Sequence, residues 1–155
     1  MVKPDQVRRA LLDASCLIGI IAGDPAFAAL QSLLRAVDEG SVTLVESTAI
    51  LTEVLPTHPR GDLAKRGIIQ DLLESPRTEL VDVTVVVARR AAELRVEHGL
   101  KTWDAIHLAT GIVSSVDVVF VRDSKFPTGH TVDGVYVSNP YDIDEDKLPF
   151  DLPGD

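Results

Sequence analysis

Four acidic residues interrupt apolar segments of this chain, where an uncompensated charge would cost folding free energy. Asp13 follows the apolar run Ala10–Leu12, and Asp123 follows the run DVVFVR. Glu53 lies in ILTEVL, and Asp104 lies in WDAIHLAT. Carboxylates gathered in one place repel one another and take up protons unless a cation neutralises them. Whether the four acids share a site depends on the elements that carry them.

Short β-branched runs alternate with longer segments rich in Ala and Leu. This alternation predicts an α/β domain with a mostly parallel sheet of about five strands and helices on both faces. The run DVVFVR is apolar almost throughout, as expected of a central strand that is buried on both faces. The expected strands are Arg8–Asp13, Val42–Glu46, Thr78–Val83, Asp117–Arg122 and, at an edge, Val132–Val137.

Helices are expected between the strands, because capping residues flank the intervening segments. Asp24 before Pro25 is a helix-start signal, Ser47 is a candidate N-cap, and Gly40 and Gly99 are helix stops. These signals divide the chain without any internal repeat. The expected helices are Pro25–Gly40, Ser47–Leu55, Asp62–Glu74, Ala88–His98 and Thr102–Val113.

In open parallel sheets, sites form beyond the carboxyl ends of the strands. Asp13 and Asp123 both end predicted strands and would project from the same edge, and the helices that carry Glu53 and Asp104 can converge there. Taken singly, each acid has a structural explanation: Asp104 would complement its helix dipole, and Glu53 would face water. Together, the four favour one shared crevice.

A hard cation would neutralise such a crevice, and Mg²⁺ or Mn²⁺ suits carboxylate ligands. Zinc is disfavoured because Cys16 is the only cysteine and the four histidines lack ligand spacing. His107, one turn after Asp104, is expected to pack or to support the acids. A carboxylate-bound cation can activate water against a phosphodiester. The sequence contains no nucleophile elbow, Walker loop or dinucleotide fingerprint.

The ordered segments LLDASCLIG, ESTAILTEVL, WDAIHLATG and VFVRDSKF resemble the PIN-domain nucleases, and within them the VapC-type toxins of toxin–antitoxin pairs. The resemblance reaches to about Pro140. It implies a PIN-like three-layer α/β/α domain over residues 1–140 and a Mg²⁺- or Mn²⁺-dependent endoribonuclease. It also implies an RNA substrate, a homodimer, and an antitoxin whose tail blocks the site.

The resemblance assigns roles to the four acids, all of which are expected to be catalytic. Asp13, Asp104 and Asp123 would bind the metal directly or through water, and Glu53 would orient or deprotonate the attacking water. Ser15 matches a small polar residue that either supports the site or caps a helix. The chain departs from the family at Val121, where relatives often carry Thr or Ser. Trp103 replaces a smaller residue and is expected to pack, with stacking on an RNA base as the alternative.

The net charge of −9 argues against a general basic nucleic-acid surface. Much of that charge lies in residues 141–155, which are expected to form an acidic tail with six acids and one lysine. No apolar run approaches the ~20 residues of a membrane span. With no signal-peptide segment at the start, we expect a cytoplasmic protein with no membrane partner.

Three other interpretations compete with a toxin. A PIN-domain RNA-processing nuclease without an antitoxin would carry the same acids. A PIN-fold module that only binds a partner would not need all four. A receiver-type phosphoacceptor domain fits poorly, because the third strand ends at Asp82-Val83 and Asp13 is not preceded by a paired acid.

Overall fold

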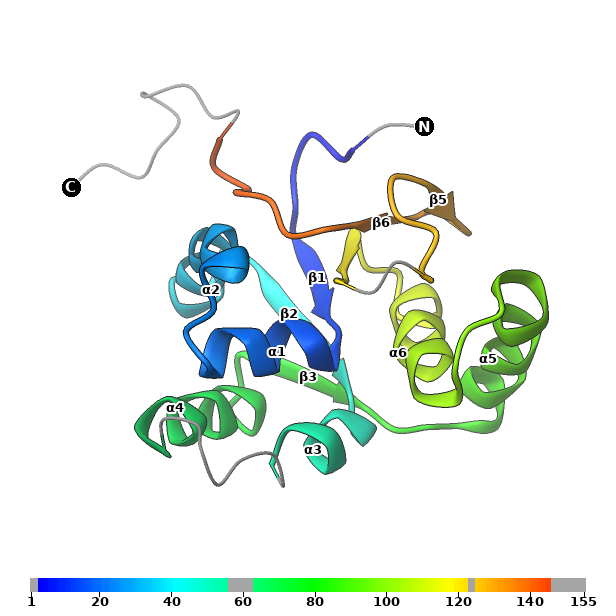
Figure 1. Cartoon of the computed structure of the whole chain (residues 1–155), viewed down its shortest axis with the longest axis horizontal. Coiled ribbons are helices and arrows are strands. Elements are labelled where there is room, and N and C mark those ends of the chain that lie inside the picture. Colours follow the sequence, from blue (N-terminus) through cyan, green and yellow to red (C-terminus); the bar gives the residue numbers. More distant parts are fainter. Residues whose placement is uncertain (1–2, 56–62, 123–124, 146–155) are drawn as a thin grey trace.

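The computed structural model describes residues 3–55, 63–122 and 125–145 of the 155-residue chain. Strands and helices alternate along the described residues (Figure 1). The strands are β1 (Arg9–Leu12), β2 (Thr43–Ser47), β3 (Thr78–Val81), β4 (Val118–Phe120), β5 (Thr131–Val132) and β6 (Val135–Ser138). The helices are α1 (Ala14–Ile21), the 3₁₀ helix η1 (Pro25–Leu30), α2 (Gln31–Asp38), α3 (Ala49–Val54), α4 (Leu63–Leu73), α5 (Val85–His98) and α6 (Thr102–Val113).

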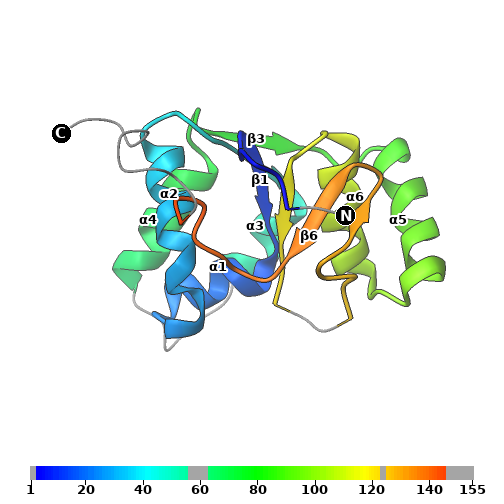
Figure 2. The same ribbon diagram turned by 90° about the horizontal axis from the view of Figure 1, so that it is seen from above.

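The strands form one sheet in the order β3-β2-β1-β4-β6-β5. All neighbouring pairs are parallel except β5 and β6, which are antiparallel. Helices α1, α2 and α4 lie on one face of the sheet, and α5 and α6 lie on the other (Figures 1 and 2). The predicted three-layer fold with a mostly parallel sheet is therefore confirmed, with six strands described where about five were expected.

Two buried cores lie on the two faces of the sheet. Ala10 and Leu12 of β1 belong to the core beneath α1, α2 and α4, whereas Leu11 belongs to the core beneath α5 and α6. Successive side chains of a strand point to opposite faces, so a strand covered on both sides must be apolar at every position. This explains the continuous apolar runs that lead into Asp13 and Asp123.

The prediction of a single edge strand over Val132–Val137 is wrong. The segment is a hairpin in which Val132 of β5 faces Val135 of β6. Asp133 and Gly134 join the strands with φ angles of 48° and 83°. Two successive positive φ angles are typical of a two-residue hairpin turn whose twist matches the strands. β6 is consequently an interior strand between β4 and β5.

Helix α1 was not predicted, and the predicted helix Pro25–Gly40 divides into η1 and α2. The residues of α1 are almost uniformly apolar and buried, so they lack the one-sided periodicity that identifies a surface helix. Asp24 does cap η1, because its carboxylate accepts a hydrogen bond from the Ala26 amide at 2.9 Å. The capping residue Asp24 therefore predicted a helix start correctly, whereas the apolar pattern of the buried helix α1 did not reveal the helix.

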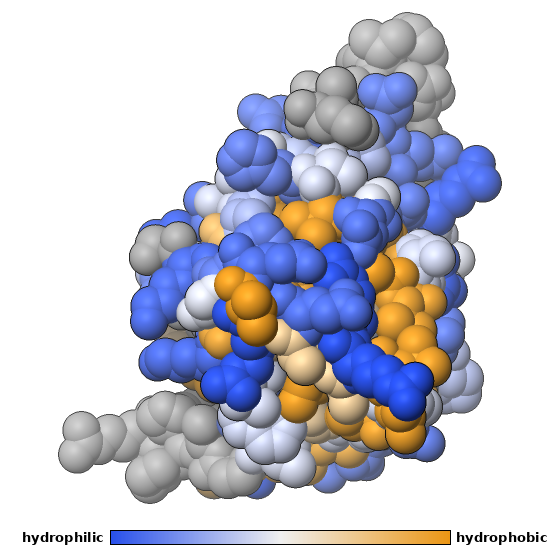
Figure 3. Space-filling view, turned by 90° about the vertical axis from the view of Figure 1, so that its right-hand side faces the viewer, coloured by the Kyte–Doolittle hydropathy of each residue, from blue (hydrophilic) through white to orange (hydrophobic). Residues whose placement is uncertain are grey.

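The outer face of α5 mixes charged and apolar side chains (Figure 3). Arg90 joins this helix to the β5–β6 turn, since its guanidinium contacts the Asp133 carboxylate and also pairs with Glu93 on α5 at 2.7 Å. Trp103 at the start of α6 is 49% exposed, so it packs only in part.

The first residues of the expected tail contact the domain. The ring of Tyr141 packs edge-on against Phe120, with ring centroids 5.1 Å apart, and the Ile143 amide donates to the Ser32 hydroxyl at 3.1 Å. Residues 146–155 lie outside the described part of the chain. Among the described helices, none alone is long and apolar enough to span a membrane. Only the bent pair Ala14–Ile21 and Pro25–Asp38 meets that test, by length and composition, and both helices contribute to the buried core.

Gly19→Ala is expected to destabilise the protein by roughly 1–3 kcal/mol, because overpacking a tight core forces strain. A Cβ atom at Gly19 would lie 2.2 Å from a carbon of the Phe27 ring. Urea unfolding followed by circular dichroism measures the change in the free energy of unfolding.

Gly67→Ala is the matched control, because a Cβ atom at Gly67 in α4 would meet nothing within 4 Å. The helix propensity of Ala should make this variant more stable by about 0.5–1 kcal/mol. If the Gly19 and Gly67 variants changed stability equally, the close approach of α1 to Phe27 would not matter energetically.

Candidate active site

Asp13 lies where β1 passes into α1 and is held by both elements. Its backbone N–H donates to the Phe120 carbonyl of β4 at 3.0 Å. Its Oδ1 accepts hydrogen bonds from the Ser15 hydroxyl at 2.7 Å and from the Cys16 amide at 3.0 Å. Asp13 is therefore the N-cap of α1, and Ser15 supports it from within the first turn.

The Asp13 side chain is only 3% exposed, and this burial raises its pKa above the usual value. The hydrogen bonds from Ser15 and Cys16 and the nearby His107 oppose the rise without cancelling it. Burial disfavours the charged form of a carboxyl group unless a positive charge is close. Asp13 is thus a carboxylate whose ionised form would be stabilised by a bound cation.

Glu53 on α3 and His107 on α6 meet beneath the same edge. The His107 Nε2 and the Glu53 Oε1 are in hydrogen-bonding contact. His107 is fully buried, and its Nδ1 has no partner among the described residues. The contact joins α3 to α6 and restricts the orientation of the Glu53 carboxylate. His107 therefore contacts a predicted site residue, as its spacing from Asp104 suggested.

Glu46 was not singled out from the sequence, although it is fully buried in β2. Its Oε1 accepts a hydrogen bond from the Leu12 amide at 2.9 Å, and its Oε2 has no partner within the described residues. Burial raises its pKa well above the usual range, and the charges of Asp13 and Glu53 add to that rise. The sequence did contain a signal for Glu46: it lies in a predicted parallel strand, and an acid in a strand that is covered on both faces must be buried.

Asp104 and Asp123 are placed less completely. Asp104 lies in the first turn of α6, partly buried and one turn before His107, in agreement with its predicted position. Asp123 lies outside the described residues. Val121, two residues earlier, is fully buried, and a valine side chain has no hydroxyl group to offer to the site.

Asp13 and Glu46 are neighbours through Leu12, whose amide donates to Glu46, and Glu53 contacts His107; His107 in turn acts on the pKa of Asp13, and Glu53 on that of Glu46. In the described ranges, no three acidic, histidine or cysteine side chains are placed to hold a metal ion. The chemistry of the donors nevertheless fits a hard cation, because the carboxyl groups of Asp13 and Glu46 are buried and have raised pKa values, so a cation would stabilise their ionised forms.

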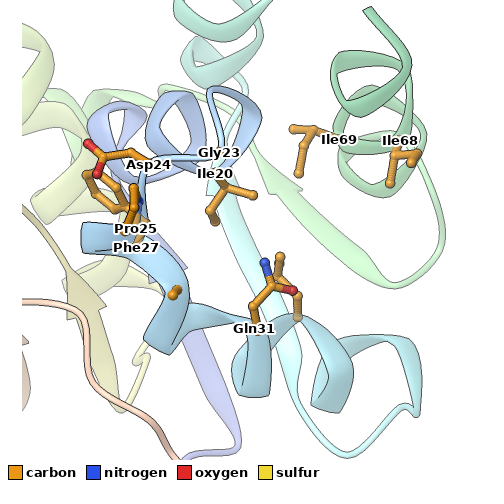
Figure 4. Close-up of a pocket in the computed structure, with 10 residues that line it drawn as sticks. Ile20, Gly23, Asp24, Pro25, Phe27, Gln31, Ile68 and Ile69 are labelled. Carbon is orange, nitrogen blue, oxygen red and sulfur yellow. The ribbon is translucent and has the colours of Figure 1, made fainter. Parts of the chain in front are cut away.

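An apolar pocket of about 420 Å³ lies away from these acids, between α1, η1, α2 and α4 (Figure 4). Ile20, Phe27 and Ile69 line it, and Asp24 lies at η1 beside them. The guanidinium carbon of Arg122 lies 5.9 Å from the centroid of the Phe27 ring. The pocket is thus connected through Phe27 to the residue that precedes Asp123.

Replacing Asp13 by Asn is expected to stabilise the metal-free protein near neutral pH. The folded-state pKa of Asp13 is raised, so the folded state retains a proton that the unfolded chain has lost above the ordinary value of 3.8. The wild-type free energy of unfolding therefore falls as pH rises from about 4, by about 1.4 kcal/mol for each unit of pKa difference. Unfolding in EDTA across pH 3–7 would measure this.

The gain from Asp13→Asn should vanish below the ordinary pKa, where both states carry the proton. Asp24→Asn is the control, because Asp24 also caps a helix but is exposed, and Asn caps as well as Asp. A stability gain for Asp13→Asn that is independent of pH would contradict the burial argument.

The family model described as PIN domain matches residues 10–128, which is most of the chain. No curated protein matches the chain. Similar solved structures include a toxin–antitoxin complex from Klebsiella pneumoniae, with 23% identity, a TM-score of 0.61, and coverage of 86% of this chain and 98% of that chain.

Two further structures have the same fold at 16% identity and a TM-score of 0.59. One is VapBC2 from Rickettsia felis bound to a DNA fragment from its promoter, with 84% of this chain and 98% of that chain covered. The other is VapC20 from Mycobacterium tuberculosis, a toxin that cleaves the sarcin–ricin loop, with 80% and 97% covered. The predicted resemblance is confirmed: this chain belongs to the PIN domain family.

Proposed function

We propose that this chain is a Mg²⁺- or Mn²⁺-dependent endoribonuclease and the toxin of a toxin–antitoxin pair. The observation that carries the proposal is the buried carboxyl group of Asp13 at the carboxyl end of β1. The charge of His107, which contacts Glu53, acts on this carboxyl group. Membership of the PIN domain family and the fold of VapC20, a toxin that cleaves RNA, support it.

Asp13, Asp104 and Asp123 are the proposed metal-binding residues. The cation would acidify a bound water and stabilise negative charge on the phosphate. It would also account for an acidic chain that receives a polyanion, since the local charge of the site becomes less negative on binding. Asp13 can serve this role because Ser15 and Cys16 hold its Oδ1 and so fix the direction of the carboxylate.

Glu53 is proposed to orient the attacking water and to accept its proton. His107 contacts Oε1 of Glu53 and so determines which way the carboxylate faces. A base held in this way needs no reorientation when the substrate binds, which lowers the cost of reaching the transition state. The role of His107 is therefore to position Glu53.

The proposed partners are RNA, a second copy of the chain and an antitoxin, in the cytoplasm. The structures from Klebsiella pneumoniae and Rickettsia felis are complexes of toxins with antitoxins. An antitoxin with an apolar segment and a basic side chain would suit this chain, because the pocket of Ile20, Phe27 and Ile69 is apolar and the candidate site is acidic. Burial of apolar side chains would supply affinity, and charge would direct the basic group to the acids.

Asp13→Asn and Asp104→Asn are each expected to reduce metal-dependent cleavage of RNA at least about 100-fold, by removing a charged metal ligand. The assay incubates purified chain, free of partner, with a mixed RNA pool in Mg²⁺ or Mn²⁺, and EDTA should abolish cleavage. Asp24→Asn, an exposed capping residue, should retain full activity.

Two outcomes would reject this assignment. Cleavage that survives both site substitutions would mean a contaminant or a different site. If no RNA is cut, calorimetric titration with Mn²⁺ decides the matter. Binding that requires Asp13 would indicate a narrow RNA target, and the absence of binding would favour a module that only binds a partner.

His107→Leu is expected to lower kcat about 10-fold with little change in KM, because the Glu53 carboxylate loses its fixed orientation. His107→Gln, which keeps a side-chain amide able to hydrogen-bond, should recover part of the loss. In a Glu53→Gln background the Leu substitution should have a much smaller effect on kcat. Additive effects of the two substitutions would show that His107 acts independently of Glu53.

A further inference from the structure

The neighbouring strands β1 and β2 stop pairing before the candidate site. β1 and β2 pair at Arg9 with Thr43 and at Ala10 with Leu44, and no later pair is formed. β1 nevertheless continues beside β4 as far as Leu12, which faces Phe120, and β2 continues beside β3 to Ser47. The backbones of β1 and β2 therefore part toward their carboxyl ends, immediately before Asp13.

This separation leaves one backbone N–H of β1 without a strand partner. Amide groups of successive residues in a strand point to opposite neighbours. The Asp13 N–H donates to Phe120 of β4, so the Leu12 N–H points toward β2. There the Glu46 Oε1 accepts it at 2.9 Å. A side-chain oxygen thus occupies the position that a β2 carbonyl would take in a continuous ladder.

We propose that Glu46 is a positioning residue for Asp13: its carboxyl group bridges the opening between β1 and β2 and sets the position of the strand end that carries Asp13. The proposal rests on the proposed function, in which Asp13 binds the metal. It assigns Glu46 no contact with metal or RNA, because the carboxyl group acts through the Leu12 amide.

The burial of Glu46 argues against a role in packing alone. The side chain is 0% exposed, and its Oε2 has no partner among the described residues. A leucine of similar size would fill the same space without burying the Oε2 atom, but it would leave the Leu12 N–H without its acceptor. The acid therefore buries one unsatisfied oxygen in order to make a hydrogen bond that an apolar side chain cannot make.

Glu46 also lies close enough to the acids to influence them directly. The charges of Asp13 and Glu53 both act on its carboxyl group, and burial together with these charges favours its neutral form. A neutral carboxyl group accepts the Leu12 hydrogen bond without adding a further negative charge to the cluster. Glu46 can thus bridge β1 and β2 beside Asp13 without a second negative charge that would repel the Asp13 carboxylate.

The test compares Glu46→Leu with Glu46→Gln in the full chain. Gln retains a carbonyl oxygen for the Leu12 N–H, whereas Leu removes the acceptor at similar volume. Glu46→Met is a second apolar variant should the branched side chain prevent folding. Glu79→Leu is the matched control, because Glu79 is an acid on the neighbouring strand β3 whose carboxylate is exposed and pairs with Arg9.

Three quantities are measured for each variant. They are the hydrogen-exchange rate of the Leu12 amide by NMR, the Mn²⁺ affinity by calorimetry, and the free energy of unfolding in urea. For Glu46→Leu we expect Leu12 exchange and the Mn²⁺ dissociation constant each to rise about 10-fold, while the free energy of unfolding changes little, because removal of the buried acid offsets the hydrogen bond that Leu12 loses. Glu46→Gln and Glu79→Leu should retain the wild-type exchange rate and affinity.

The proposal is overturned if Glu46→Leu leaves Leu12 protection and Mn²⁺ affinity unchanged. It is also overturned if affinity falls equally in Glu46→Gln, or only in proportion to a loss of stability. Failure of the proposed function is distinguishable, because the wild-type chain would then bind Mn²⁺ no better than Asp13→Asn. In that case, unchanged Leu12 exchange in Glu46→Leu would still reject the strand-bridging role.

Discussion

The hydrogen bond from the Asp13 amide to the Phe120 carbonyl is the contact on which the arrangement of the site depends. It ends the pairing of β1 with β4 and places the Asp13 side chain where it can cap α1. The same residue is therefore the end of a strand, the beginning of a helix and a buried acid. Because a cap must accept backbone N–H groups, the carboxylate cannot turn away from the helix without loss of stability.

Helices α3 and α6 bring Glu53 and His107 together, and close packing makes that possible. Gly111 lets α6 approach the sheet, since a Cβ atom there would lie 2.8 Å from Cγ2 of Val119 on β4. The approach places His107 in the interior, where it meets Glu53 on α3. The position of Glu53 thus depends on a glycine far from it in sequence, through the packing of α6 on the sheet.

The acids of the site work against the stability of the metal-free fold. Burial raises the pKa values of Asp13 and Glu46, so their ionised forms are disfavoured by the surroundings. Proteins retain such groups where function requires them, at a cost that the rest of the core must offset. The two apolar cores on either face of the sheet provide that compensation here.

The sequence alone determined the fold class, because alternating β-branched and helical segments have few other solutions, and it identified Asp13 by its place after an apolar strand. The capping signals of Asp24 and Gly99 were equally local. Only the tertiary structure decided that Asp133 and Gly134 turn a hairpin, and that Glu46 bridges β1 and β2. Packing across the whole sheet decides where two neighbouring strands stop pairing, and no local pattern of residues predicts that point.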